Sequence, residues 1–146
     1  ILPLDQKSDV TLDGQGWKKL GKYLEKRKII NDERFLFTRK WFLSGELGWA
    51  MENRYPVTVF NTNSSHSFAF WVDHKKFEGR DGIYISTSRY NYDPIEKYAE
   101  YFSKITAIDT LETERNSQPG KSFYIWFCED YQGNYPFAYG KSAKKR

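Results

Sequence analysis

Hydrogen-bonding and stacking side chains are concentrated in one stretch of the chain, Asn-Thr-Asn-Ser-Ser-His-Ser-Phe-Ala-Phe-Trp, between Asn61 and Trp71. Asn and His side chains donate and accept hydrogen bonds. An indole ring can stack on the flat apolar face of a sugar. Because a simple connector needs few such groups, we expect a binding function here, and within it we single out Asn61, Asn63, His66 and Trp71. A loop held by its own side chains is the alternative interpretation.

Nucleophilic catalysis is a second interpretation of the same segment. Ser64, Ser65 and His66 lie close in sequence to Asp73 and His74, and a serine becomes a useful nucleophile when an imidazole accepts its proton. The chain lacks a Gly-x-Ser-x-Gly elbow, and adjacent Ser and His residues point to opposite faces of an extended segment. We therefore expect ordinary loop residues here and no catalytic residue.

Metal and cofactor binding are not expected. His66 and His74, with Asp73, match neither the spacing of two ligands on one helix face nor that of a zinc finger. The glycine pairs at 14–16 and 79–82 lack the further residues of a phosphate-binding loop. The sequence predicts turns at both pairs.

Two charged residues lie close to this segment in the expected fold. Arg39 follows a short apolar run, and Glu46 is the one charged residue between Trp41 and Ala50. If Glu46 were buried among those apolar residues it would need a hydrogen-bonding partner. The alternative is that Glu46 lies on the solvent side of its helix.

The apolar spacing predicts alternating helices and strands. A turn at 13–16 is expected to begin a helix whose buried face carries Trp17, Leu20 and Leu24. Thr38 is placed to cap the second helix, and Asp93 precedes Pro94 at the start of a third. In the second helix we expect Gly45 and Gly48 to permit close packing. Strands are predicted at 34–38, 57–60, 81–86, 104–115 and 122–129, and helices from 17, at about 40–53 and from 94 to about 101–103.

This order predicts an α/β domain over residues 1–140, followed by a basic tail at 141–146. Its mixed sheet should have a parallel core, helices on its faces and an appended antiparallel hairpin that turns at 116–120. In the strand at 104–115, strict alternation puts Ile105, Ala107, Asp109, Leu111 and Thr113 on one face. Ligands of such sheets bind at the carboxyl ends of the strands. The predicted binding residues are Arg39, Glu46, Asn61, Asn63, His66 and Trp71.

Composition narrows the classes of function. The net charge of +4 equals the four cations among the last six residues, so residues 1–140 balance and show no excess of cations for nucleic acid. The lone Cys128 excludes an internal disulfide and a cysteine-based zinc cluster. No apolar run reaches the ~18 residues of a membrane span. Because the chain opens at Ile1 without an initiator Met, we expect a piece of a longer protein.

Three segments carry a family resemblance that covers about residues 9 to 90. They are Asp13 with Gly-Trp-Lys-Lys-Leu-Gly at 16–21, Thr38-Arg39 before a helix with Ser-x-Glu-Leu at 44–47, and the loop from Asn63 that ends in an aromatic residue and Trp71. In these segments the chain resembles the C-terminal soluble domain of bacterial membrane glycosyltransferases of the dolichyl-phosphate-mannose protein mannosyltransferase and aminoarabinose transferase type. The aromatic stretch from Phe123 to Tyr139 departs from the family pattern.

The resemblance implies a parent enzyme that transfers a sugar from a polyprenyl-phosphate carrier on the extracytoplasmic, periplasmic side of the cytoplasmic membrane. Membrane helices would precede this domain, and its partners would be the membrane portion of the parent protein and the lipid-linked sugar or a glycan or lipid acceptor. The family's catalytic acidic residue belongs to a loop that this chain does not match. We therefore expect an accessory role in recognising acceptor or donor. A free-standing extracytoplasmic module that binds carbohydrate or protein is the alternative.

Overall fold

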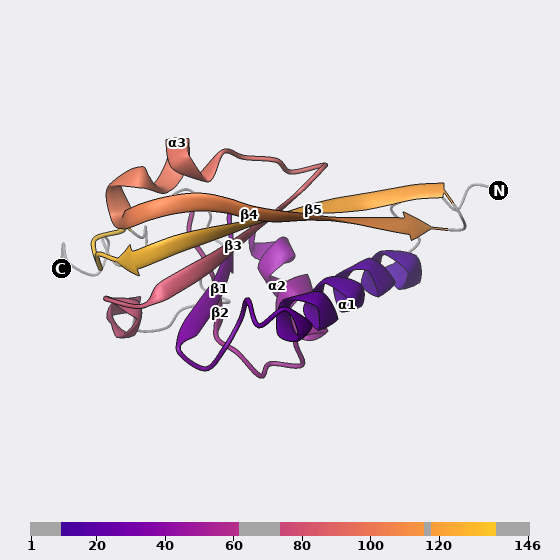
Figure 1. Cartoon of the computed structure of the whole chain (residues 1–146), viewed down its shortest axis with the longest axis horizontal. Coiled ribbons are helices and arrows are strands. Elements are labelled where there is room, and N and C mark those ends of the chain that lie inside the picture. Colours follow the sequence, from indigo (N-terminus) through magenta and orange to yellow (C-terminus); the bar gives the residue numbers. More distant parts are fainter. Residues whose placement is uncertain (1–9, 62–73, 116–117, 137–146) are drawn as a thin grey trace.

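A computed structural model describes residues 10–61, 74–115 and 118–136 and confirms the predicted α/β class. Helices and strands alternate over the first part of the chain, and two long strands follow (Figure 1). The elements are α1 (Val10–Lys26), β1 (Arg34–Thr38), α2 (Trp41–Ala50), β2 (Val57–Val59), the 3-10 helix η2 (His74–Phe77), β3 (Asp81–Thr87), α3 (Pro94–Tyr98), the 3-10 helix η3 (Ala99–Tyr101), β4 (Phe102–Arg115) and β5 (Gln118–Tyr131).

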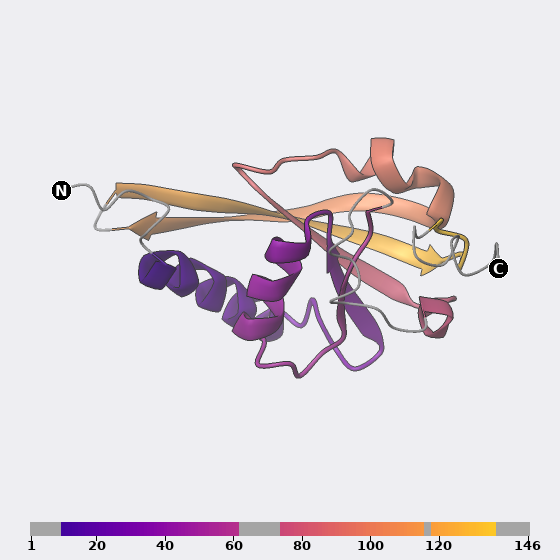
Figure 2. The ribbon, with the colours of Figure 1, turned by 180° about the vertical axis from the view of Figure 1, so that it is seen from behind.

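The sheet has five described strands in the order β2-β1-β3-β5-β4. β1 pairs in parallel with β2 and β3, and Leu36 lies opposite Val57 on one side and Ile83 on the other. β5 runs antiparallel to both β3 and β4, as predicted for the appended hairpin. The hairpin extends well beyond the parallel strands, and α1 runs beneath its outer part (Figures 1 and 2).

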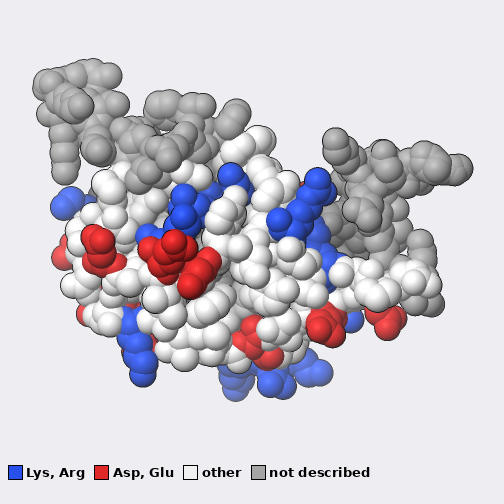
Figure 3. All heavy atoms as spheres, turned by 90° about the horizontal axis from the view of Figure 1, so that it is seen from above, with Lys and Arg blue, Asp and Glu red and all other residues white. Residues whose placement is uncertain are grey.

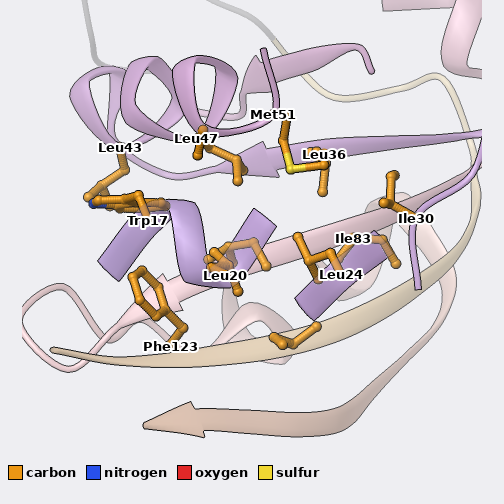
Figure 4. Packing of buried hydrophobic residues seen from close by; sticks show 13 residues of the cluster. Trp17, Leu20, Leu24, Ile30, Leu36, Leu43, Leu47, Met51, Ile83 and Phe123 are labelled. Carbon is orange, nitrogen blue, oxygen red and sulfur yellow. The ribbon is translucent and has the colours of Figure 1, made fainter. Parts of the chain in front are cut away.

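Each face of the sheet has its own core because side chains alternate along β1. Leu36 faces α1 and α2, where it packs with Leu20, Leu24 and Leu47 of the two helices (Figure 4). Phe35 and Phe37 face the other side, which is almost wholly aromatic. That aromatic core also contains Phe60, Phe77, Tyr84, Tyr98, Phe102, Tyr131 and Tyr135.

Gly82 of β3 allows the aromatic core to close on the sheet. A Cβ added at Gly82 would lie 2.8 Å from Cζ of Phe35 and 3.0 Å from Cε1 of Phe37. Side-chain carbons do not approach so closely, so any other residue here would push both rings away from the strand. The absence of a side chain at position 82 therefore sets the packing around β1 and β3.

The predicted turn at 13–16 was wrong, because α1 begins at Val10 and continues through it. Each glycine in a helix interior costs about 1 kcal/mol of stability relative to Ala, so two glycines in 13–16 led to the prediction of a turn. In the fold, the Cα of Gly16 lies against β4 and β5, since an added Cβ would meet Thr113 Oγ1 at 3.8 Å and the Phe123 ring at 3.9 Å. This packing against the hairpin favours a helical conformation at 13–16. The predicted burial of Trp17, Leu20 and Leu24 is confirmed.

Thr38 does not cap α2 as predicted. The residue at the N-cap position is Lys40, and it makes no side-chain capping bond. The Thr38 hydroxyl instead lies 2.8 Å from the carbonyl oxygen of Lys40 and 2.7 Å from Ser44 Oγ. Ser44 donates in turn to the carbonyl of Thr58 at 2.7 Å. This buried chain of hydroxyls joins β1, α2 and β2. Asp93, by contrast, caps α3 as predicted by accepting from the Ile95 N–H at 2.9 Å.

Close packing at Gly45 and Gly48 was also a wrong prediction. Nothing lies within 4 Å of a Cβ built on Gly45, and at Gly48 only Asn53 Oδ1 lies at an ordinary contact distance of 3.5 Å. The glycine at which the helices approach is Gly21 of α1, where a Cβ would lie 3.1 Å from Met51 Sδ and 3.2 Å from the carbonyl oxygen of Ala50.

The strict alternation predicted for β4 is broken by an irregularity between Ala107 and Asp109. Before it, Ile105 packs against the aromatic core, and after it, Leu111 packs against the core under α1 and α2. One extra residue shifts the following side chains to the other face. The predicted single face from Ile105 to Thr113 is therefore divided in two.

Candidate functional site

The carboxyl ends of β1 and β2 meet at one edge of the sheet because the two strands are parallel. Arg39 follows the first strand, and Phe60 and Asn61 follow the second. The side-chain amide of Asn61 donates to the carbonyl of Arg39 at 2.9 Å, and the Phe60 N–H donates to the carbonyl of Thr38 at 3.0 Å. Two of the predicted binding residues, Arg39 and Asn61, therefore lie together at the edge where ligands of such sheets bind.

The guanidinium of Arg39 is held by two tyrosines. It is half-buried, interacts with the nearby Tyr98 hydroxyl, and lies 5.3 Å from the centre of the Tyr92 ring. The ammonium of Lys40 lies 5.6 Å from the same ring. Within the described residues no carboxylate lies within ion-pair distance of Arg39 or Lys40. We call Arg39, Lys40, Asn61, Tyr92 and Tyr98 the edge cluster.

Burial and the nearby hydroxyls act in opposite directions on Arg39. Burial lowers the pKa of its guanidinium, whereas the interactions with Tyr98 and the other nearby tyrosines raise it, and the net shift is upward. Arg39 therefore stays charged at every physiological pH. A fixed cation that is oriented by rings and has no carboxylate partner among the described residues is suited to recognising an anion such as a phosphate.

The hydroxyls of Tyr98 and Tyr84 differ although both rings are fully buried and lie 5.5 Å apart. Tyr98 donates to the carbonyl of Phe60 at 2.6 Å, which ties α3 to the end of β2. The Tyr84 hydroxyl has no hydrogen-bond partner within the described part of the chain. Burial raises the pKa of both hydroxyls, so both remain protonated at neutral pH.

The remaining predicted residues do not join the edge cluster in what the structure describes. Glu46 is partly exposed on α2, which covers the face of the sheet opposite to Tyr84 and Tyr98. Asn63, His66 and Trp71 lie outside the described residues, as do Ser64, Ser65 and Asp73 of the hydrolase and metal interpretations. The edge cluster therefore contains two of the six predicted binding residues.

No group of metal-ligating side chains is found among the residues that the structure describes. Cys128 lies fully buried in the aromatic core, and burial raises the pKa of its thiol. This thiol belongs to the packing and lacks the thiolate character of a nucleophile. In the same part of the chain, no helix is both long and apolar enough to cross a membrane.

A surface depression of about 440 Å³ lies at the opposite edge of the sheet, between residues 31–34 and 79–81. Its main cation, Arg80, donates to the carbonyls of Glu33 at 2.9 Å and Asp32 at 3.0 Å. These bonds join the loop before β1 to the turn before β3. We therefore assign the depression a structural role and keep the edge cluster as the candidate site.

Sequence reasoning missed Lys40, Tyr92 and Tyr98. Tyr92 directly precedes the Asp93-Pro94 helix start, and Tyr98 lies one turn into that helix. Their place beside Arg39 depends on how α3 packs against the end of β2. That contact is made between segments far apart in sequence, and no local pattern reports it.

Comparisons of the chain with protein-family models, with curated proteins and with solved structures found no match in any of the three. The function is therefore inferred from the edge cluster and from the resemblance in the sequence.

Proposed function

We propose that the chain is the extracytoplasmic accessory domain of a membrane glycosyltransferase that uses a polyprenyl-phosphate sugar. In this role the edge cluster recognises the phosphate-bearing sugar, and the transfer reaction takes place elsewhere in the parent protein. The observation that carries the proposal is the half-buried, tyrosine-held Arg39 at the carboxyl edge of the parallel strands, with no carboxylate partner in the described residues. The domain itself supplies binding and orientation.

The chemistry of the cluster fits such a ligand. A guanidinium presents five N–H donors in a plane, and two of them can address one phosphate. Lys40 adds a second positive charge beside the same Tyr92 ring. The ring of Tyr92 is only partly buried and offers an apolar surface to a sugar. Phosphate and sugar are the two parts of the carrier that leave the bilayer.

The experiment that tests this proposal compares two arginine variants of the full-length protein in a sugar-transfer assay. Arg39→Gln removes the cation of the edge cluster. Arg27→Gln is the matched control, since the exposed Arg27 guanidinium lies 5.4 Å from the Tyr23 ring at the far end of α1. We expect Arg39→Gln to raise KM for the lipid-linked donor by about tenfold or more, the usual loss for a charge-assisted bond. Equal activity of both variants, with both folded, would contradict the role of the edge cluster.

The reading frame upstream of Ile1 separates this proposal from a free-standing binding module. Several apolar stretches of ~20 residues are expected for the glycosyltransferase. A signal peptide directly before the domain, with no such stretches, would favour the module instead.

A further inference from the structure

The solvent side of α2 is unusually apolar. Trp41 is 39% exposed and Trp49 is 53% exposed. Gly45 lies exposed midway between them, so the three residues repeat every four positions along one side of the helix. Two turns separate the indoles, which is about 12 Å along the helix axis. We call Trp41, Gly45 and Trp49 the α2 stripe.

The core does not account for the α2 stripe. Leu43, Leu47 and Ala50 already bury the opposite side of α2 against the sheet and α1 (Figure 4). Glu46 is the one charged residue within the helix. A surface helix normally carries charged side chains away from the core, so the two exposed indoles give the solvent side of α2 an unusual apolar surface.

Cations border the α2 stripe along its length. The ammonium of Lys18 in α1 lies 4.7 Å from the centre of the Trp49 ring and forms an ion pair with the exposed Glu52 at 3.3 Å, and Lys40 directly precedes Trp41. Lys19 and Lys22 of α1 are exposed and form no ion pair with any described residue. The described side chains of α1 include four lysines, Lys18, Lys19, Lys22 and Lys26, and one glutamate, Glu25.

The side of the molecule that carries α3 has a different distribution of charged side chains. α1 and α2 lie on one side of the β4–β5 hairpin and α3 on the other (Figures 1 and 2). Seen from the α3 side, basic and acidic side chains alternate in small groups (Figure 3). Ile95 of α3, which is 48% exposed, has charged neighbours of both signs in sequence, namely Asp93, Glu96 and Lys97. Indoles bordered by lysines occur on the α2 side.

We propose that the α2 stripe docks on the surface of an anionic phospholipid bilayer. Indole rings favour the interface between headgroups and acyl chains, and lysines that flank them meet the anionic phosphates. Gly45 leaves a gap between the two indoles, so both can enter the interface together. Given the proposed function, this docking also brings Arg39 and Lys40 next to the headgroups, since they directly precede the stripe.

Cosedimentation of the chain with lipid vesicles tests the proposal. Because the vesicles contain no glycosyl phosphate, a chain that does not bind them would overturn the docking proposal and leave the proposed function intact. The wild type is compared on vesicles of equal parts phosphatidylcholine and phosphatidylglycerol and on pure phosphatidylcholine. We expect partition to the anionic vesicles at millimolar lipid, weakened by salt because the lysine contribution is screened. Replacing Trp41 and Trp49 together by Ala should lower the partition coefficient by about tenfold or more, and Lys22→Gln by about fivefold.

Ile95→Ala and Lys97→Gln on α3 are the matched controls, and both should partition as the wild type does. Circular dichroism checks that every variant is folded. No partition of the wild type to anionic vesicles, or an equal loss in the α3 controls, would overturn the proposal. So would a wild-type dimer in sedimentation velocity that the double tryptophan variant abolishes, because the stripe would then serve a second copy of the chain.

Discussion

Two tyrosine-to-phenylalanine changes in the aromatic core provide a sharp test of the hydrogen bonding behind the edge cluster. Tyr84 and Tyr98 are both fully buried, their rings lie 5.5 Å apart, and each loses one hydroxyl in the change. The Tyr98 hydroxyl donates to the Phe60 carbonyl at 2.6 Å, whereas the Tyr84 hydroxyl has no partner in the described residues. The two variants should therefore differ in their free energies of unfolding.

The expected magnitudes follow from the bonds that are lost. Tyr98→Phe removes the donor of a buried hydrogen bond, which costs about 1–3 kcal/mol, so it should lower the free energy of unfolding by about that amount. A buried hydroxyl without a partner is itself unfavourable. Tyr84→Phe should therefore leave the stability unchanged or raise it by about 1 kcal/mol.

Urea unfolding followed by tryptophan fluorescence measures both values, and equal slopes for the variants show that the unfolded states are comparable. For a chain of this size a difference of about 3 kcal/mol also separates the Tm values by roughly 6–12 °C. If Tyr84→Phe lost as much stability as Tyr98→Phe, the described partners of the two hydroxyls would be wrong, and so would the account of how Arg39 is held.

Three further outcomes are expected. Gly82→Ala should lower the free energy of unfolding by about 1–3 kcal/mol, because its Cβ would lie 2.8 Å from Phe35 Cζ. Gly45→Ala should raise the free energy of unfolding by about 0.5–1 kcal/mol, because nothing lies within 4 Å of its Cβ. Urea unfolding measures both variants, and similar losses of stability would contradict the packing described at Gly82. The Cys128 thiol, whose pKa burial raises, should react with a disulfide reagent only in denaturing urea, and rapid labelling of the folded chain would show that it is accessible. The Tyr23 hydroxyl donates to Asp109, which lowers the pKa of that carboxyl, and the Thr110 N–H at 2.8 Å lowers it further. This stabilisation is complete above the unfolded pKa of about 3.9 and is lost as pH falls through the lower folded pKa. Tyr23→Phe should therefore make the free energy of unfolding fall less steeply at acid pH. An unchanged slope would refute the bond between Tyr23 and Asp109.

Local patterns were sufficient to predict most elements. The apolar run of β1, the buried face of α1 and the Asp93 cap of α3 each depend on residues a few positions apart, and all three are confirmed. The neighbouring positions of Arg39 and Asn61 also followed, because parallel strands place their carboxyl ends at one edge. The predicted order of strands and helices was therefore sufficient to bring these two residues together.

Several of the wrong predictions, though not those at Thr38, Gly45 and Gly48, share one cause, which is contact between segments far apart in sequence. Gly16 was expected in a turn, but its packing against Thr113 and Phe123 of the hairpin keeps it helical. The break between Ala107 and Asp109 depends on the pairing with β5. Tyr98 reaches Arg39 only because α3 packs beside the end of β2. The sequence pattern carries no signal for these contacts, so the tyrosines of the edge cluster were missed.

The central claim is that the edge cluster binds a sugar phosphate. Titrating the isotope-labelled chain with mannose 1-phosphate, followed by amide NMR, tests it most directly, with free mannose and the Arg39→Gln variant as controls. We predict saturable shifts of the amides of Arg39, Asn61 and Tyr92, absent with mannose alone and lost in the variant. A folded chain whose edge-cluster amides do not move at saturating sugar phosphate, or move equally in Arg39→Gln, would contradict the account.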